Sequence, residues 1–185
     1  MALTSTLFRF HIELSDIDRS LYETLELRVP CHPSEERDRL VLRVLARAIL
    51  SEEGLEFGRG LSHTEDPALW TRSPGGDILR WIDVGAPAGE RLHRASKKAR
   101  STHVVTTKHR TVLAKEWAKA HIHQSDAIEV IHLPGTTVSS LADTLDRSND
   151  WFVTIQDNHL TISDGKHDFG AALSRTTLDE FVQGT

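Results

Sequence analysis

Near the start of the chain, apolar and polar residues alternate in two successive runs. The first run covers residues 4–14 and the second covers 22–29. Strict alternation is the pattern of a β-strand with one buried face, because successive side chains of a strand point to opposite sides. The turn-forming pair Ser15-Asp16 follows the first run. The pattern therefore predicts an antiparallel hairpin with a fairly long connection.

A helical pattern comes next and is the clearest in the sequence. Its apolar residues recur at three- and four-residue steps, at positions 41, 42, 45, 48 and 49. Pro33-Ser34 is typical of a helix start, and Gly54 marks the end. Glu35 then lies in the first turn, where the helix dipole favours negative charge. Seven-residue steps align it with Leu42 and Ile49, so we expect its side chain to point inward.

The middle of the chain alternates between β-type and helical runs. It predicts strands over 55–61, 77–84, 102–107 and 127–133, and helices over 89–99, 111–121 and 138–145. Residues 62–76 are predicted as a loop, longer than the usual 2–6 residues, which is a length that often marks function. Strand–helix–strand order implies parallel pairing, because parallel strands need a crossover connection.

The C-terminal part predicts a second hairpin and a short final segment. Residues 151–155 and 159–163 pair across Asp157-Asn158, and 167–182 form a last strand and a helical turn. The sequence has no internal repeat, low-complexity segment or linker. We therefore expect one domain over 1–185, of the α/β (α+β) class, with a mixed β-sheet flanked by helices.

Composition restricts the class of protein further. The chain has 185 residues, with 38% hydrophobic and 26% charged, as in ordinary globular proteins. It has no apolar run of about 20 residues that would cross a bilayer, and its start, MALTSTLFRFHIEL, does not resemble a signal peptide. Cys31 is the only cysteine, which excludes an internal disulfide and a cysteine-based zinc site. We expect a soluble cytoplasmic protein without a membrane partner.

Charge is unevenly distributed along the chain. The net charge is −5, which argues against a protein covered in basic residues for nucleic-acid binding. Residues 91–119 nevertheless contain nine Lys or Arg and one acid, Glu116, whereas 120–185 contain ten acids and three Lys or Arg. Such a basic stretch suits a confined phosphate-binding face. The alternative is two solvated helix faces, which is the more usual origin of a run of charges.

Several common catalytic motifs are absent. The sequence contains no Walker-type phosphate loop, no GxGxxG, no GxSxG and no HExxH. Among eleven histidines, His121 and His123 form the closest pair, but surface histidines explain them more simply than a metal site does. Cys31 beside His32 suggests a thiol nucleophile only weakly, because adjacency in sequence does not create hydrogen-bond geometry.

Three acids are more informative. Glu35 lies at the start of the predicted helix, Asp66 precedes Pro67 in the long loop, and Asp83 lies in the apolar strand Trp81-Ile82-Asp83-Val84. A carboxylate inside such a strand needs solvent, a partner or a function, because an unpaired buried charge is costly. Carboxylates that converge from a helix, a loop and a strand suit Mg²⁺. Each also has a structural alternative: Glu35 paired with Arg39, Asp66 capping a turn, and Asp83 ending a strand.

A set of segments resembles the bacterial YaeQ family across essentially the whole chain. The segments are, in order, HPSEERDRLVLRVLA, FGRGL, EDPALW, LRWIDVGAP and ERLHRASKKA. The resemblance implies a variant of the PD-(D/E)XK nuclease fold, which is restriction-endonuclease-like. It also implies that Glu35 matches the helix acid, Asp66 the first aspartate and Asp83 the second acid of a Mg²⁺ site that activates water for attack on nucleic acid.

One position departs from the pattern that the resemblance implies. The lysine expected two residues after Asp83 is replaced by Gly85. In variant nucleases this lysine can move to the following helix, which here offers Arg94, Lys97 and Lys98. An arginine in that place would bind phosphate or stabilise charge, because it stays protonated and cannot act as a base.

Two functions are therefore expected. The first is a Mg²⁺-dependent nuclease or phosphodiesterase that uses Glu35, Asp66, Asp83 and either Arg94 or Lys97. In that reading Lys98 and Arg110 contact phosphates of a DNA or RNA partner. The second is a non-catalytic regulatory protein that binds nucleic acid or protein and retains the nuclease-like fold.

Overall fold

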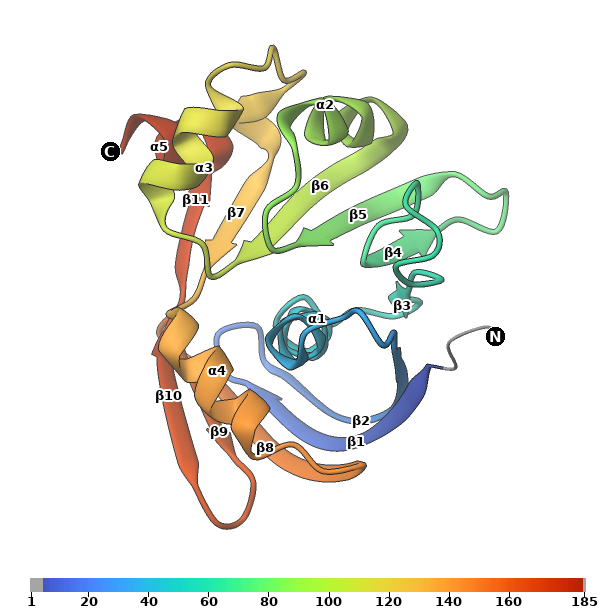
Figure 1. The fold of residues 1–185 in the computed structure, drawn as a ribbon, viewed down its shortest axis with the longest axis vertical. Coiled ribbons are helices and arrows are strands. Elements are labelled where there is room, and N and C mark those ends of the chain that lie inside the picture. The colour runs from blue at the N-terminus through green and yellow to red at the C-terminus, as the bar shows by residue number, and fades with distance from the viewer. Residues whose placement is uncertain (1–4, 185) are drawn as a thin grey trace.

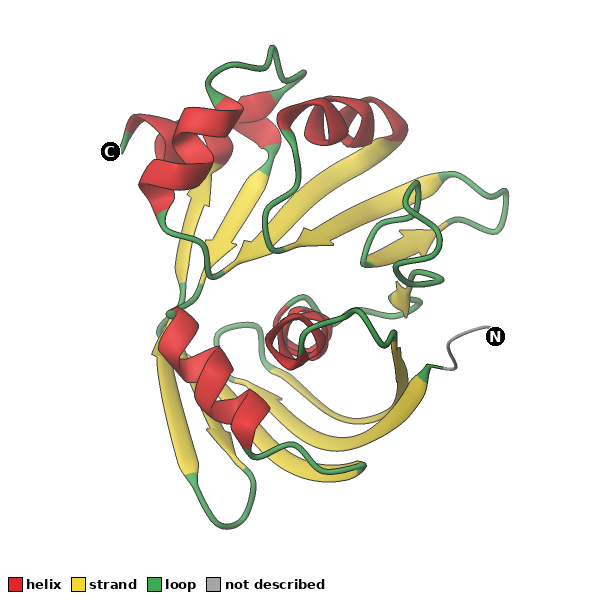
Figure 2. Ribbon diagram, in the orientation of Figure 1, coloured by secondary structure: helices red, strands yellow, loops and turns green. Residues whose placement is uncertain are grey.

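The computed structural model describes residues 5–184, which form two β-sheets with helices between and outside them (Figures 1 and 2). The strands are β1 (Thr6–Asp16), β2 (Leu21–Cys31), β3 (Glu56–Phe57), β4 (Leu69–Arg72), β5 (Ile78–Val84), β6 (Ala99–Thr106), β7 (Glu129–His132), β8 (Ser148–Gln156), β9 (His159–Ser163), β10 (Asp168–Ala172) and β11 (Ser174–Thr177). The helices are α1 (Arg37–Ile49), α2 (Gly89–Lys98), α3 (Arg110–Trp117), α4 (Gly135–Asp143) and α5 (Leu178–Gln183), with a short 3₁₀ turn at Ser125–Ala127.

The first sheet has five strands in the order β10-β9-β8-β1-β2. The predicted hairpins are confirmed, since β1 pairs with β2 and β8 pairs with β9, both antiparallel. The predicted first strand begins at Thr4, which lies outside the described residues. β1 also pairs in parallel with β8, which comes far later in the chain. This pairing joins the N-terminal and C-terminal hairpins into one mixed sheet.

The second sheet has six strands in the order β11-β7-β6-β5-β4-β3. The expected parallel pairing is confirmed, because β5, β6 and β7 run parallel. Helices α2 and α3 make the crossovers and cover one face together with α5 (Figure 1). The mixed α/β class predicted from the sequence is thus confirmed, but the strands are divided between two mixed sheets rather than forming one.

Residues 62–76 are not one continuous loop, contrary to the expectation. Within them β4 pairs antiparallel with both β3 and β5. The predicted strand over 55–61 is reduced to the two residues of β3. β4 is only four residues long and is surrounded by turn-forming residues. Its pattern was therefore too short to separate from the loop by alternation alone.

Helix α1 begins at Arg37, later than Pro33 and Ser34 had predicted. Residues before it form a turn, and Glu36 is the N-cap residue without a side-chain capping bond. The helix lies between the two sheets (Figure 1). Most of its residues are buried, which fits a helix that packs on both sides. Glu35 is therefore in the turn that precedes α1 and is not in its first turn.

The two sheets share one hydrophobic core. Its largest cluster includes Phe10 of the first sheet, Leu45 of α1 and Ile82 of the second sheet. A smaller cluster lies beneath α2, α3 and α5. The C-terminal tail also links the sheets, because it forms β10 in one and β11 in the other, where a single last strand was expected. No helix within residues 5–184 has the length and apolar character needed to span a bilayer.

Candidate functional site

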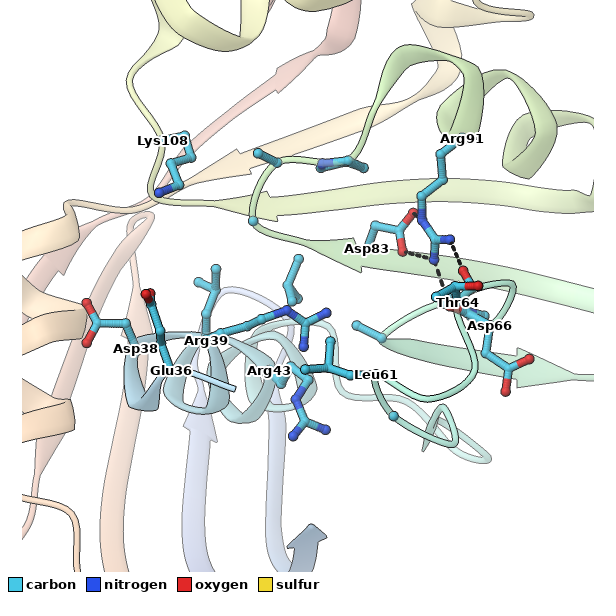
Figure 3. Close-up of a pocket in the computed structure, with 18 of the residues that line it drawn as sticks. Glu36, Asp38, Arg39, Arg43, Leu61, Thr64, Asp66, Asp83, Arg91 and Lys108 are labelled. Carbon is cyan, nitrogen blue, oxygen red and sulfur yellow. Dashed lines mark hydrogen bonds and ion pairs between the residues drawn. The ribbon is translucent and has the colours of Figure 1, made fainter. Parts of the chain in front are cut away.

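A cleft of about 470 Å³ lies between α1 and the carboxyl ends of β5 and β6. One wall comes from α1 through Arg39 and Leu42, and the opposite wall comes from Asp83 and from Lys108, which follows β6. A turn-rich segment over 60–68 closes one end (Figure 3). Ligands of α/β proteins commonly bind where parallel strands end, and the volume is within the range of small-ligand sites. This cleft is therefore the candidate site.

Asp83 is at the wall of the cleft and is held by an arginine. It is 4% exposed. Nε and Nη2 of Arg91 donate to its two carboxylate oxygens, each at 2.8 Å, and the indole Nε1 of Trp81 donates to Oδ2 at 2.9 Å. Two parallel hydrogen bonds between guanidinium and carboxylate make a strong, well-oriented ion pair. Asp83 thus has a partner for its charge without any metal ion.

Arg91 also binds two backbone carbonyl groups. Its Nη1 donates to Thr64 O at 2.5 Å and its Nη2 donates to Asp66 O at 2.7 Å (Figure 3). Its guanidinium carbon lies 5.4 Å from the centre of the Trp81 ring. One side chain from the start of α2 therefore ties β5 to the segment over 60–68 and defines that end of the cleft.

Asp66 contributes its backbone to this end of the cleft, while its carboxylate is directed away from Asp83 (Figure 3). The carboxylate accepts from Nε and Nη2 of Arg59 at 2.6 and 3.0 Å. The hydrogen bonds from Arg59 hold the pKa of Asp66 below its usual range, because they favour the charged form. Asp66 is therefore ionised and already paired.

Glu35 is buried beside the cleft and is shared by two arginines. Its side chain is 2% exposed, so the expectation that it points inward is confirmed. Arg43 donates to both carboxylate oxygens at 2.8 Å, and Nη1 of Arg39 donates to Oε1 at 2.8 Å. Burial lowers the pKa of Arg43, but the adjacent carboxylate opposes this shift. Glu35 therefore holds Arg39 at the cleft wall.

These carboxylates do not fit a shared Mg²⁺ site. Glu35, Asp66 and Asp83 are each bound by a different arginine or pair of arginines. Within residues 5–184, no group of three or more His, Cys, Asp or Glu side chains is arranged to hold a metal ion. A divalent ion needs several oxygen ligands at 2.0–2.6 Å around one point. The expected convergence of the three acids on one ion is not present in this arrangement.

The basic residues expected to complete the site lie elsewhere. Arg94 is 58% exposed and lies 3.7 Å from Glu65 in an ion pair, while Lys97 and Lys98 are exposed. None of them lines the cleft. Arg110 donates to the carbonyl groups of Phe181 and Val182 at 3.2 and 3.4 Å. Its guanidinium therefore links α3 to α5 within the fold, away from the cleft.

None of the Lys or Arg residues that line the cleft is among the site residues predicted from the sequence; they are Arg39, Arg43, Arg91 and Lys108. Arg91 belongs to the basic stretch over 91–119, but the residues predicted to replace the lysine, Arg94, Lys97 and Lys98, lie one to two turns further along the helix. Sequence separation alone could have indicated Arg91. When a short connection joins a strand to the next helix, the first turn of that helix lies nearest to the end of the strand. Asp83 is next to the last residue of β5, so Arg91 rather than Arg94 reaches it.

The geometry supports neither a thiol nucleophile at Cys31 nor a histidine metal site. The thiol of Cys31 contacts the backbone oxygens of His32 and Glu35, and burial raises its pKa. A raised pKa disfavours the reactive thiolate. The ring of His32 bonds Ser34 instead. His121 and His123 are both exposed in the connection after α3.

Together the fold and the cleft define a mixed α/β protein in which α1 separates two sheets and a ligand-sized cavity opens at the ends of parallel strands. The family model described as "YaeQ protein" matches residues 1–173. The chain therefore belongs to the YaeQ family, and the resemblance seen in the sequence is confirmed.

Individual relatives agree with this assignment. The chain is 29% identical over 177 residues to "Uncharacterized protein YaeQ" of Salmonella typhi, covering 94% of this chain and 97% of the relative. The same values of identity and coverage hold for the protein of that name from Escherichia coli K12, over 179 residues.

Two solved structures share the fold. The YaeQ protein from Xanthomonas axonopodis pv. citri superposes with a TM-score of 0.87 at 31% identity, covering 93% of this chain and 98% of that one. The YaeQ protein from Pseudomonas syringae gives 0.85 at 30% identity, covering 92% and 95%. The arrangement of two sheets around a central helix is thus common to this chain and both solved relatives.

Proposed function

We propose that this protein binds phosphate groups of a nucleic acid in the cleft without cleaving them. The observation that carries the proposal is the pair Arg39 and Lys108, which approach the cleft from its two sides. Arg39 uses only Nη1 for Glu35, and within residues 5–184 neither its remaining N–H groups nor the Lys108 ammonium has a hydrogen-bonded partner. Free guanidinium and ammonium donors are the groups that bind phosphate.

The pairing of the acidic side chains with arginines supports phosphate binding rather than phosphodiester cleavage. A metal-dependent phosphodiesterase needs carboxylates that are free to hold the ion that activates water. Asp83 is instead paired with Arg91, and Glu35 with Arg39 and Arg43. Arginine cannot accept a proton from water at neutral pH, so these pairs offer no general base. The same pairs cancel negative charge that would otherwise repel a phosphate.

Two acids at the cleft remain outside arginine pairs and shape the choice of ligand. Glu36 and Asp38 also line it, near the start of α1 (Figure 3). Carboxylates there repel a phosphate placed directly beside them but accept hydrogen bonds from hydroxyl and amino groups. A ligand with both phosphates and such donors matches this mixture. Nucleotides within a nucleic acid have both.

Fluorescence anisotropy with labelled single-stranded DNA, duplex DNA and RNA, each in EDTA and then in Mg²⁺, tests the proposal. We expect binding in EDTA that weakens with salt. Lys108→Ala and Arg39→Ala should each weaken it about tenfold, because a lost hydrogen bond to a charged group costs roughly 1.5 kcal/mol or more. Lys97→Ala is the matched control, because Lys97 is an exposed lysine on α2 outside the cleft.

Two results would contradict phosphate binding in the cleft. One is the absence of salt-sensitive binding to all three nucleic acids. The other is loss of binding in Lys97→Ala with no change in Lys108→Ala, which would assign the contact to the outer face of α2.

The second candidate function is a Mg²⁺-dependent nuclease, as the sequence resemblance implies. One observation favours it: Asp83 lies near the carboxyl end of a parallel strand at the cleft, where α/β sheets bind their ligands. It requires Arg91 to leave Asp83. Incubation of the same nucleic acids with Mg²⁺ or Mn²⁺ separates the two functions. Cleavage that disappears in Asp83→Asn would establish the nuclease and exclude the purely binding function.

A further inference from the structure

Four oxygen atoms from two parts of the chain are hydrogen-bonded to the guanidinium of Arg91. They are both carboxylate oxygens of Asp83 on β5 and the backbone oxygens of Thr64 and Asp66 in the segment over 60–68. The four N···O distances lie between 2.5 and 2.8 Å. Nη2 alone is shared by Asp83 Oδ1 and Asp66 O. All four oxygens thus accept hydrogen bonds from one cation, the guanidinium of Arg91.

Carboxylate and carbonyl oxygens are the ligands that Ca²⁺ and Mg²⁺ take in proteins. Here they surround an organic cation of fixed shape instead. We infer that Arg91 is a built-in replacement for a metal ion, and that its removal turns Asp83, Asp66 O and Thr64 O into a site for a hard divalent or trivalent cation. Only these oxygens form the cation site, whatever ligand the cleft takes.

Because the Asp83 carboxylate is buried, it needs another cation when Arg91 is removed. Asp83 is 4% exposed, and without Arg91 its only remaining hydrogen-bond donor among residues 5–184 would be the Trp81 indole. A buried carboxylate without a compensating charge is costly, so it must gain a cation or a proton. Asp83 and Arg91 both line the cleft, so the space left by a shortened Arg91 is open to ions from solvent.

Within residues 5–184, this oxygen set is not a conventional metal cluster of several acidic side chains. The site has a single acid, because the carboxylate of Asp66 is turned toward Arg59 and only its backbone oxygen points to Arg91. One carboxylate with two carbonyl oxygens and water is a weak combination for Ca²⁺. We expect a dissociation constant on the order of 10⁻⁴–10⁻³ M, as in sites with few charged ligands.

Terbium luminescence is the measurement, because Tb³⁺ binds Ca²⁺-type sites and is sensitised by a nearby indole. Trp81 lies 2.9 Å from a carboxylate oxygen of Asp83. Arg91→Ala should bind Tb³⁺ at least tenfold more tightly than the wild-type protein, and Ca²⁺ should compete. The added substitution Asp83→Asn should abolish that gain. Arg94→Ala, an exposed arginine on the same helix, should match the wild type.

A second measurement does not depend on Arg91→Ala folding well. Arg91→Met keeps apolar bulk beside Trp81 while it removes the charge. Millimolar Ca²⁺ should raise the melting temperature of this variant, because an ion that binds only the folded state stabilises it. The same Ca²⁺ should leave the wild type and Arg91→Met/Asp83→Asn unchanged.

Three outcomes would overturn the inference. They are Tb³⁺ binding in Arg91→Ala no tighter than in the wild type, equal binding in the Asp83→Asn double variant, and no Ca²⁺ effect on the melting of Arg91→Met. Nucleic-acid binding in the cleft depends on Arg39 and Lys108, so its failure would leave these results unaffected, and the two proposals fail separately.

Discussion

Glu35 and Arg43 form a buried ion pair in which both carboxylate oxygens accept a hydrogen bond at 2.8 Å. Their side chains are only 2% and 3% exposed. Arg43 also donates to Pro30 O at 2.9 Å, which ties α1 to the end of β2. The pair therefore fixes the turn before α1 and, through Glu35, the position of Arg39 at the cleft.

Loss of Glu35 should destabilise the fold strongly. Glu35→Ala leaves the buried charge of Arg43 without its partner, so we expect the free energy of unfolding to fall by about 3–5 kcal/mol. Urea denaturation followed by tryptophan fluorescence measures it. Glu36→Ala is the control, because Glu36 is exposed and makes no capping bond, and it should stay within about 0.5 kcal/mol. Equal effects of the two substitutions would contradict a structural role of the pair.

Gly58 should not tolerate a side chain. A Cβ atom there would lie 2.0 Å from Pro67 O, a backbone atom that cannot move freely. Gly58→Ala should therefore displace the segment that carries Thr64 and Asp66 and cost about 1–3 kcal/mol, as overpacking does. Thermal unfolding and amide exchange of that segment measure it. In Gly75→Ala the new Cβ has only an ordinary contact at 3.6 Å, so wild-type stability is the expected result and a matching loss would refute the steric reason.

Protonation of Glu129 should lower the free energy of unfolding at acid pH. Hydrogen bonding to His103, aided by Arg175, lowers the pKa of Glu129 from 4.5 to about 2. A carboxyl group whose pKa is depressed by folding stabilises the protein above its unfolded value, and this contribution is lost as pH falls from about 4.5 to 2. The full shift corresponds to at most about 3.4 kcal/mol, and solvent screening of the partly exposed side chain makes about 1–2 kcal/mol the expected size.

The measurement is the unfolding free energy of wild type and Glu129→Gln between pH 2 and 7. The variant should be less stable above pH 4.5, and the difference should shrink as the pH approaches 2. Glu116→Gln, an exposed acid on α3, should follow the wild type throughout. A difference between wild type and Glu129→Gln that does not vary with pH would exclude the ionic contribution.

The last helix should depend on its N-terminal cap. Thr177 accepts from the Glu180 backbone N–H at 3.2 Å, and the Glu180 carboxylate accepts from the Thr177 backbone N–H at 2.7 Å, which is a complete capping box. Thr177→Ala should cost about 1 kcal/mol. Thermal unfolding should show Thr177→Ser, which keeps the hydroxyl group, near wild type. Equal losses in both variants would show that the methyl group, rather than the cap, matters.

The local elements of this protein could be predicted because they rest on short-range patterns. Alternation over 4–14 and 22–29 predicted the β1–β2 hairpin, and apolar spacing predicted α1. The predictions were wrong where an apolar pattern was short, or where local signals suggested different starting points for one helix. β4 has four residues among turn formers, and Pro33-Ser34 suggested a helix start that in fact lies at Arg37.

By itself, the sequence determined the α/β class, the family and the inward position of Glu35. Tertiary structure alone decided which charges meet. The parallel pairing of β1 with β8 and the passage of the C-terminal tail between sheets join residues far apart in the chain, and no local periodicity encodes such contacts. Arg91 reaches Asp83 rather than solvent because β5 and α2 meet at one end of the cleft, where burial requires a partner for that carboxylate.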